Sequence, residues 1–446
     1  MLTVVAFLVA IGVLVTVHEF GHYLVARWCG VKVLRFSIGF GKPILRFVRG
    51  GTEWVVALVP LGGYVKMLDE REGPVDAAER SQAFNTQSVF KRIAIVVAGP
   101  LANFLTAIVL FYAVLLPGGE TLAPRVGMVV PQSAASAAGL LPGDTVRAVN
   151  GEPVADWDAL RSAMAEGVGS AGQLVVEVER GQRVLNLPVD LERFGLTRLD
   201  EKTVGRIGVL PQRFLPKIAF VEPGGAAEQA GLAKGDILKT LDGRTVAGWG
   251  EWVVAIQNRP GQLMQVGVER AGRTLQLALR PASVEAGGVV QGRIGAAPAL
   301  DEAWLASLRR PVDYGVFGAL VQAVERTWRM SAQTLKMMGG MFVGQVSLDA
   351  ISGPLTIADY AGKTASMGWQ SYLSFMAVIS VSLGVLNLLP VPVLDGGHLL
   401  YYVAELVRGR PLSERAQQIG QRLGLALILT LMMIALFNDL GRMLGG

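Results

Sequence analysis

The sequence has few of the residue types that build metal and redox sites in most soluble proteins. Only Cys29 is a cysteine, which excludes an intramolecular disulfide and a zinc site made of cysteines. Only three residues are histidines, so at most three imidazole groups are available as metal ligands. Charged residues make up 17% of the 446 residues, against about 25% in a typical soluble protein. This shortage of charge favours a membrane protein.

The N-terminal segment lacks the marks of a cleaved signal peptide. No basic residue precedes its apolar run, and residues 1–24 contain no Lys, Arg or Asp. We therefore expect this segment to remain as the first of several membrane-spanning helices. Each predicted span is long enough to cross about 30 Å of hydrocarbon. The predicted spans are residues 2–24, 93–117, 370–390 and 423–444.

The basic residues predict the orientation of these spans. The segment from Arg27 to Thr52 contains several Lys and Arg residues and no acidic residue, and Arg408, Arg410 and Arg415 follow the third span. Loops of this kind stay in the cytoplasm. Both termini and residues 118–366 are then expected on the other side of the membrane, outside the cytoplasm. The basic residues form no domain-wide patch, so no nucleic-acid partner is expected.

The first span contains His18-Glu19-Phe20-Gly21-His22. On a helix this spacing places two imidazoles on one face, where both can bind one zinc ion, and the intervening Glu can act as a general base on water. Ionisable residues at membrane depth cost about 2.5–3.5 kcal/mol each, so they usually have a function. The pattern predicts a zinc site within the membrane, with His18 and His22 as ligands and Glu19 as the base.

The segment after the first span has the composition of β-strands. Residues 52–66 are rich in β-branched and aromatic residues, and Gly39-Phe40-Gly41 lies in a turn-like stretch. We expect residues 33–66 to form a hairpin or small sheet that enters the membrane interface beside the site. In the second span, Pro100 predicts a kink. Asn103 has either an active-site role or an interhelical hydrogen bond.

Residues 120–283 contain an internal repeat with an offset of 92. Ala138-Gly139-Leu140 with Gly143-Asp144 matches Ala230-Gly231-Leu232 with Gly235-Asp236, and Asn150-Gly151 matches Asp242-Gly243. The repeat resembles the PDZ domains of bacterial membrane and periplasmic proteases. We predict two tandem PDZ-like domains, at residues 118–210 and 211–283. The resemblance implies binding of peptides or C-termini by strand addition. A size filter or spacer is the alternative function.

Residues 284–366 are predicted to contain a linker and one amphipathic helix. Within residues 313–345, apolar residues recur every four positions between charged ones. This pattern favours a helix that lies in the membrane interface. Packing of the same helix under the PDZ-like domains is the alternative.

A catalytic zinc ion needs a third protein ligand. The candidates are Asp395 and His398, which follow Pro390 and Pro392 at the end of the third span. The two prolines should end the helix, and Gly396-Gly397 allows a tight turn that could direct Asp395 back toward the first span. The residues alone favour Asp395 and leave His398 open.

Three sequence segments together resemble the site-2 protease family of intramembrane zinc metalloproteases. They are His18 to His22, Ala98-Gly99-Pro100-Leu101-Ala102-Asn103-Phe104, and Asn387 to Gly397. The two PDZ-like domains between spans two and three resemble the bacterial branch of this family that regulates sigma-E. The resemblance implies that Asp395 is the third zinc ligand, that Asn387 contacts substrate or the tetrahedral intermediate, and that His398 has a supporting role.

The resemblance also implies a function. We expect a polytopic α-helical membrane protein with four transmembrane helices, a membrane-associated β-hairpin or sheet, and two tandem PDZ-like α+β domains. Its substrates would be single-pass membrane proteins that another protease has already trimmed, such as an anti-sigma factor, or remnant signal peptides. The predicted substrate contacts are Gly39, Phe40, Gly41, Asn103, Pro390 and Pro392. A non-catalytic PDZ scaffold with a structural metal site and a metal transporter are the alternatives.

Overall fold

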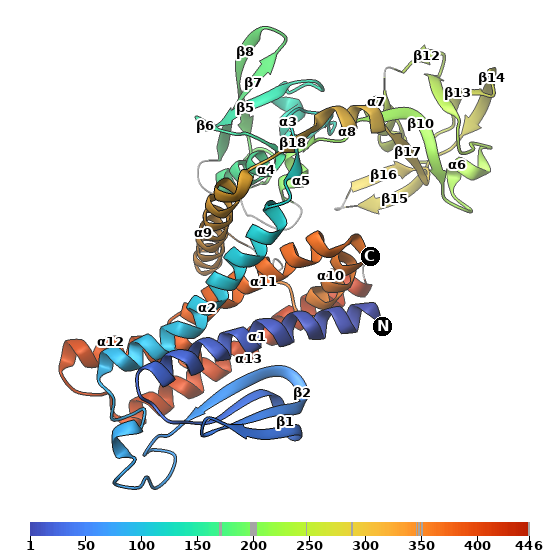
Figure 1. Cartoon of the computed structure of the whole chain (residues 1–446). Helices are drawn as coiled ribbons and strands as arrows, with labels where there is room; N and C mark the ends of the chain where they lie inside the picture. The colour runs from blue at the N-terminus through green and yellow to red at the C-terminus, as the bar shows by residue number, and fades with distance from the viewer. Residues whose placement is uncertain are drawn as a thin grey trace. The chain divides into compact units, whose positions relative to one another are not determined.

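The computed structural model describes residues 1–168, 172–196, 203–246, 248–286, 289–344, 346, 348 and 351–444. The chain forms two compact units (Figure 1). The first unit contains Met1–Gly119, Asp313–Val343 and Leu348–Gly446, and the second contains Glu120–Val312 and Gly344–Ser347. The helices of the first unit are α1 Leu2–Trp28, α2 Val89–Leu115, α9 Gly315–Phe342, α10 Pro354–Met367, α11 Trp369–Leu388, α12 Asp395–Arg408 and α13 Glu414–Leu444, with a short 3₁₀ helix at Arg80–Gln82.

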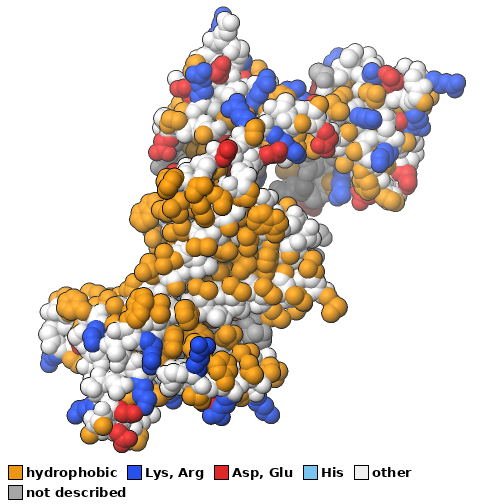
Figure 2. All heavy atoms as spheres, in the orientation of Figure 1, with side chains coloured by type: hydrophobic (Ala, Val, Ile, Leu, Met, Phe, Trp, Pro, Cys, Tyr) orange, Lys and Arg blue, Asp and Glu red, His pale blue; other side chains and the backbone are white. Residues whose placement is uncertain are grey.

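Four helices of the described chain are long and apolar enough to cross a membrane: α1, α2, α11 and the Glu414–Arg442 part of α13. They coincide with the four predicted spans, so the prediction of a polytopic α-helical protein is confirmed. α13 begins nine residues earlier than the predicted fourth span. Apolar side chains cover most of the visible face over these helices (Figure 2).

Small residues bring the spans close together. A Cβ atom on Gly21 of α1 would lie 2.4 Å from the carbonyl oxygen of Ala98 in α2, and one on Gly384 of α11 would lie 3.0 Å from the Phe104 ring. Polar groups also join helices, since Ser380 Oγ of α11 donates to the carbonyl of Asn103 at 2.7 Å. Close backbone approach and such hydrogen bonds are the main sources of association between helices in lipid.

β1 (Val33–Arg49) and β2 (Thr52–Met67) form the sheet that was predicted over residues 33–66. Residues 43–49 pair with residues 52–57. Residues 35–38 pair with two stretches of β2, residues 53–56 and residues 63–66. The stretches 43–49 and 63–67 are therefore the outer edges of the sheet. Its exposed large apolar side chains include Phe40, Ile44, Leu45, Phe47 and Val48.

The helix predicted over residues 313–345 is α9, and it packs on α2 and α11. Buried Ala323 joins Phe111 and Val381 in one apolar cluster, and the Arg326 guanidinium lies 4.9 Å from the centre of the Phe111 ring. Sequence analysis did not predict α10, which packs on α1. Asp439 of α13 accepts hydrogen bonds from the first backbone amides of α10, which fixes the start of that helix.

The second unit contains two α+β halves with similar element order. Its helices are α3 Ala134–Ala137, α4 Trp157–Gly167, α5 Thr203–Ile207, α6 Ala226–Gln229, α7 Trp249–Gln257 and α8 Glu302–Leu308. Its strands are β3 Gly119–Leu122, β4 Met128–Val129, β5 Thr145–Val149, β6 Glu152–Pro153, β7 Gln173–Arg180, β8 Arg183–Asp190, β9 Val209–Leu210, β10 Phe214–Val221, β11 Ile237–Leu241, β12 Arg244–Thr245, β13 Met264–Arg270, β14 Arg273–Leu279, β15 Ala282–Ala286, β16 Val289–Arg293, β17 Ala296–Leu300 and β18 Arg309–Val312.

Each half has its own sheet and its own core. The first sheet has the order β6-β5-β7-β8, and β4 pairs with β9 beside it. The second has the order β14-β13-β11-β10-β17, with β12 on β11. Strand β17 lies beyond residue 283, and Ile294 just before it packs in the core of the second half. The second half therefore includes residues that the sequence analysis gave to the linker.

The repeated Gly-Asp has one structural role in both halves. Asp144 accepts hydrogen bonds from Arg180 at 2.8 Å and from the Leu141 amide at 2.9 Å. Asp236 makes the equivalent contacts, with Arg270 at 2.6 Å and with the Ala233 amide. Both carboxylates are buried. The repeat thus encodes a buried carboxylate, paired with a partly exposed arginine, that holds the turn before β5 and β11.

Candidate metal centre

His18, His22 and Asp395 converge on one point, although 373 residues separate the second from the third. His18 and His22 lie one turn apart on α1, and Asp395 begins α12. The Nε2 atoms of the two histidines are 3.2 Å apart. Asp395 Oδ2 lies 3.2 Å from His18 Nε2 and 3.4 Å from His22 Nε2. Among the residues described, these three form the group able to hold a metal ion.

The separations between these atoms fit a tetrahedral zinc ion. Bonds of about 2.0–2.1 Å in that geometry set neighbouring ligand atoms about 3.3 Å apart. The proton positions agree with this. His22 Nδ1 lies 2.8 Å from the carbonyl of Ile95, which can only accept, so this nitrogen carries the proton and Nε2 of the neutral ring keeps its lone pair. Asp395 Oδ2 is buried and receives no well-formed hydrogen bond. A cation would satisfy these facing acceptors.

Asn103 supports the other imidazole. Its side-chain amide lies 3.1 Å from His18 Nδ1, and its Oδ1 is buried without a hydrogen-bond partner. The two ends of an amide are assigned from the hydrogen-bond network. If the amide is turned so that Oδ1 faces His18, it accepts the Nδ1 proton, and His18 Nε2 is then free for zinc. A contact of this kind orients a metal-bound histidine. Asn103 therefore lies at the site, and its side chain reaches a different helix.

Gly99 leaves the space that the two rings occupy. A Cβ atom there would lie 2.2 Å from His22 Nε2 and 2.8 Å from His18 Cε1. α2 continues through Pro100, and the turn just before this proline supplies both Gly99 and the Ile95 carbonyl. The Ala-Gly-Pro sequence in α2 therefore shapes the wall of the metal site.

The expected tight turn at Gly396-Gly397 is wrong, because both residues lie in the first turn of α12. Their role is close packing. A Cβ atom on Gly396 would lie 2.2 Å from the Leu389 carbonyl oxygen, and one on Gly397 would lie 2.4 Å from the Val391 carbonyl oxygen. The loop after α11 thus presses on the start of α12 and places Asp395 at its first position.

Glu19 is a residue of α1, and its side chain faces the sheet. Its carboxylate lies close enough to the Val65 backbone to interact with it, and a Cβ atom on Gly63 would lie 3.1 Å from Glu19 Cγ. The outer edge of residues 63–67 therefore faces the predicted base. A glycine at position 63 allows this approach.

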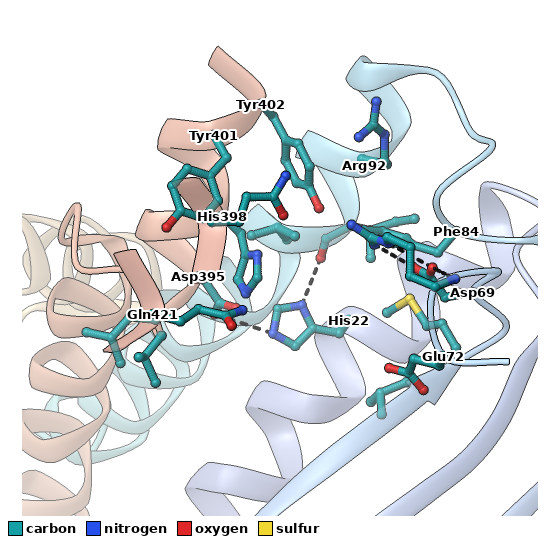
Figure 3. Close-up of a pocket in the computed structure, with 18 of the residues that line it drawn as sticks. His22, Asp69, Glu72, Phe84, Arg92, Asp395, His398, Tyr401, Tyr402 and Gln421 are labelled. Carbon is teal, nitrogen blue, oxygen red and sulfur yellow. Dashed lines mark hydrogen bonds and ion pairs between the residues drawn. The ribbon is translucent and has the colours of Figure 1, made fainter. Parts of the chain in front are cut away.

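The predicted metal ligands and Glu19 line a cavity of about 910 Å³. Figure 3 shows this cavity, with His22 and Asp395 labelled. Asn387, from the last turn of α11, lines the same cavity, as does His398. Burial lowers the pKa of His398, although the Asp395 charge opposes the shift. The rest of the lining is largely polar and includes Asp69, Arg71, Glu72, Arg92, Glu405, Gln417 and Gln421. The cavity can therefore hold water beside the metal site.

The structure does not place every predicted substrate contact at this cavity. Gly39 and Gly41 have φ values of +89° and +92°, so they form the turn that only glycine adopts readily. Phe40 between them stacks on Tyr64, which does line the cavity. Pro390 and Pro392 end α11 as expected and lie outside the described cavity lining.

Several residues of the site escaped the sequence analysis. The Ile95 carbonyl and the Val65 amide are backbone groups, which no side-chain pattern reveals. Arg92 and Glu405 are separated by 313 residues and form an ion pair beside the cavity. Only Gly99 carried a signal, because it lies in the Ala98–Phe104 segment singled out in the sequence.

Comparison with known proteins identifies the family. The family model of peptidase family M50 matches residues 6–431. The chain belongs to peptidase family M50. It is 42% identical to the regulator of sigma-E protease RseP of Escherichia coli over 98% of both chains. It is 41% identical to the RseP of Salmonella typhimurium over the same share of each chain. A Neisseria meningitidis protein that is provisionally named a zinc metalloprotease is 46% identical over 99% of this chain and 100% of its own length.

This M50 peptidase is therefore a zinc metalloprotease, and the resemblance to the site-2 protease family is confirmed. Its four spans make it a multi-pass membrane protein, and its family implies intramembrane proteolysis. The two alternative interpretations, a non-catalytic scaffold and a metal transporter, do not agree with this family membership.

Proposed function

We propose that this peptidase cleaves the transmembrane segments of single-pass membrane proteins, with His18, His22 and Asp395 as its zinc ligands. The observation that carries the proposal is the convergence of these three side chains, with Glu19 beside them, at a site whose two histidines lie on a helix apolar enough to span a membrane. A zinc-binding His-Glu-x-x-His motif at this depth has its substrate in the same layer of the membrane.

The chain supplies a base, an oxyanion contact and a shielded site. Bound zinc provides a Lewis acid that activates water and polarises a carbonyl oxygen. Glu19 takes the proton of the attacking water and returns it to the leaving amine. The Val65 backbone lies close enough to the Glu19 carboxylate to interact with it. Asn387 donates a hydrogen bond to the developing oxyanion, an effect that can be worth about 2.7–4 kcal/mol.

The sheet receives the substrate. A helical substrate hides its amides in its own hydrogen bonds, so it must unwind before it can be cleaved. The outer edge at residues 63–67 lies along the cavity, where Tyr64, Val65 and Met67 contribute to the lining. An unwound segment that pairs with this edge would be held as an extended strand beside Glu19.

The second α+β half of the second unit binds peptides or C-termini. A groove of about 550 Å³ lies against α7 and β17, and its lining includes Phe220, Trp249, Val253 and Ala296. β17 ends the described path of its sheet, which suits strand addition. Titration of the full chain with C-terminal peptides tests this proposal. Affinities no better than millimolar would instead support a size filter that rejects untrimmed substrates.

The protein lies in a bacterial inner membrane, with its active site near the cytoplasmic face and the two PDZ-like domains in the periplasm. Its substrates are of the anti-sigma factor type, already trimmed by another protease, or remnant signal peptides. The basic loops at residues 27–52 and 408–415 support this orientation. Relatives that are named regulators of sigma-E protease support the inner membrane and this class of substrate.

Cleavage by wild type and by Glu19→Gln tests the proposal. The assay uses a single-pass substrate with a truncated outer domain. We expect cleavage by wild type and none by the variant, because glutamine keeps the shape of the side chain and cannot accept the proton. Equal cleavage by both would show that Glu19 is not the base. A Glu19→Gln protein that still binds zinc confirms that the site itself is intact.

A further inference from the structure

Arg92 and Glu405 form a bidentate ion pair beside the metal site. Arg92 Nη2 lies 2.7 Å from Glu405 Oε1, and Nη1 lies 3.2 Å from Oε2. Both side chains are largely buried, with exposed fractions of 12% and 14%. The Arg92 guanidinium also lies 4.9 Å from the centre of the Tyr402 ring, and both side chains are visible above the site in Figure 3. The pair joins the start of α2 to the last third of α12.

Arg92 completes a row of positions on α2 that face the metal ligands. The row consists of Arg92, Ile95, Gly99 and Asn103, at spacings of three and four residues that keep one face of a helix. The Ile95 carbonyl fixes His22, Gly99 makes room for both rings, and Asn103 contacts His18. Asp395 has no direct hydrogen bond to this row. Arg92 makes the ion pair between α2 and the helix of Asp395, and the two helices also pack against each other.

We propose that Arg92 and Glu405 are positioning residues for the third zinc ligand. They hold α12 against α2 so that Asp395 at its first position stays within reach of His18 and His22. The proposal rests on the zinc site proposed above. In this proposal, residues on one face of α2 orient all three ligands.

The position of Glu405 gives the pair its influence on Asp395. Ten residues separate the two, which is about 15 Å along a helix. The start of α12 is packed under the loop at Leu389 and Val391. The ion pair is a second attachment near the other end. Loss of the pair removes the polar contact that fixes this end of α12 against α2. A shift of a few tenths of an ångström carried along the helix to Asp395 alters the metal geometry.

The chemistry of the pair favours positioning over simple stabilisation. Apolar residues that replace a buried ion pair often leave stability unchanged or raise it, whereas removal of one partner alone is costly. A planar guanidinium that grips both carboxylate oxygens fixes the angle between two helices as well as their distance. Tyr402 packs on the guanidinium and on Phe84, so the charged groups are shielded from water on this side.

The test compares zinc affinity, metal geometry and stability in the full-length chain. The main variant is the double substitution Arg92→Met with Glu405→Met, which removes the pair without leaving one charge buried. Zinc affinity is measured by competition with a chromogenic chelator, ligand geometry by the visible spectrum of the Co²⁺ form, and stability by thermal unfolding of the metal-free protein. Asp395→Ala is the reference for a lost ligand. Arg147→Met with Glu179→Met is the matched control, because that ion pair is exposed and lies in the second unit.

We expect the double variant to unfold near the wild-type temperature and to bind zinc about 10- to 100-fold more weakly. Its Co²⁺ spectrum should shift toward that of Asp395→Ala. The charge swap Arg92→Glu with Glu405→Arg should recover part of the affinity, and the control should match wild type. If the double variant fails to fold, Glu405→Gln is measured in its place, with a smaller loss of affinity expected in the same direction.

Two results would overturn the proposal. Wild-type zinc affinity and spectrum in the double variant, with weak binding in Asp395→Ala, would show that the ion pair does not position this ligand. Wild-type zinc affinity in Asp395→Ala would show that Asp395 is not a ligand, and the zinc site proposed above would fail with it.

Discussion

At the scale of single residues, the site depends on the space and the backbone groups that neighbouring residues provide, as well as on the ligands. The His18–His22 spacing and the candidate Asp395 could be found in the sequence, because metal ligands are few and the motif has a fixed period. The Ile95 carbonyl that sets the tautomer of His22 could not be found, because every residue has a carbonyl. The expected turn at Gly396-Gly397 was wrong for a related reason. A glycine can serve positive φ or close packing, and only the packed structure distinguishes them.

Gly99→Ala tests the steric part of this account. The added Cβ atom would lie 2.2 Å from His22 Nε2, so we expect zinc affinity to fall about 10- to 100-fold, with a parallel loss of cleavage. Chelator competition on the purified protein measures the affinity. Gly12→Ala on α1 is the control, since a Cβ atom there has no neighbour within 4 Å. Unchanged zinc binding by Gly99→Ala would mean that the rings do not occupy this space when zinc is bound.

At the scale of secondary-structure elements, the four spans, the sheet and the repeat were predictable, because apolar runs, β-rich composition and a constant offset are local signals. α12 and α10 were not predicted, because neither has an apolar run long enough for a span. Pairing within the sheet was also beyond the sequence. Residues 35–38 pair with two different stretches of β2, and a periodicity of two residues cannot specify which.

Photocrosslinking tests which edge of the sheet receives the substrate. A photoreactive benzoylphenylalanine at Tyr64, on the edge that lines the cavity, should crosslink to a single-pass substrate in the Glu19→Gln background. The same group at Phe47 lies on the opposite edge and should give little crosslink. Both sites are aromatic in the native protein, so the substitutions are matched. Stronger crosslinking at Phe47 would contradict strand pairing beside Glu19.

The buried Asp236 should make the stability of the second α+β half depend on pH. Burial raises the pKa of this carboxyl, but Arg270 and the Ala233 amide outweigh burial, so the pKa lies below its ordinary value. Its contribution is therefore complete above the unfolded pKa of about 3.9 and is lost as the pH falls through the folded pKa. Asp236→Asn should lose about 1.5–3 kcal/mol at pH 7, because hydrogen bonds to a charged group are replaced.

Hydrogen exchange of peptides from β11 and β13 measures this effect. The ratio of variant to wild-type rates at each pH cancels the intrinsic dependence on pH, and it should shrink as the pH falls toward 3. Asp242→Asn is the control, because Asn150 occupies the same place in the first half and its side chain makes the same contact to a backbone amide. A ratio that is independent of pH would contradict a role for the Asp236 charge.

At the scale of the whole molecule, two units share the work that the family implies. One holds the zinc site among apolar helices, and the other contains two small sheets with separate cores. The ligands of the site come from the two ends of the chain, while the second unit is inserted between α2 and α9. The sequence predicted this organisation, because charge depletion at the ends and ordinary composition in the middle are visible without a structure.

Cysteine labelling tests the orientation of the two units. In a Cys29→Ser background, Gln182→Cys should react with an impermeant maleimide in cells whose outer membrane alone has been opened. Gly73→Cys and Arg410→Cys should react only after the inner membrane is broken, because the adjacent basic loops are expected in the cytoplasm. All three positions are exposed. The reverse pattern would show that the protein has the opposite orientation.

The most direct test of the central claim is the position of the bond that the purified protein cleaves. A single-pass substrate with a truncated outer domain is incubated in detergent with wild type, with and without a zinc chelator, and the new termini are mapped by mass spectrometry. We predict one scissile bond within the apolar segment, cleaved only when zinc is present and restored when zinc is added back. A bond outside that segment, or cleavage that persists after zinc is removed, would contradict intramembrane proteolysis at His18, His22 and Asp395.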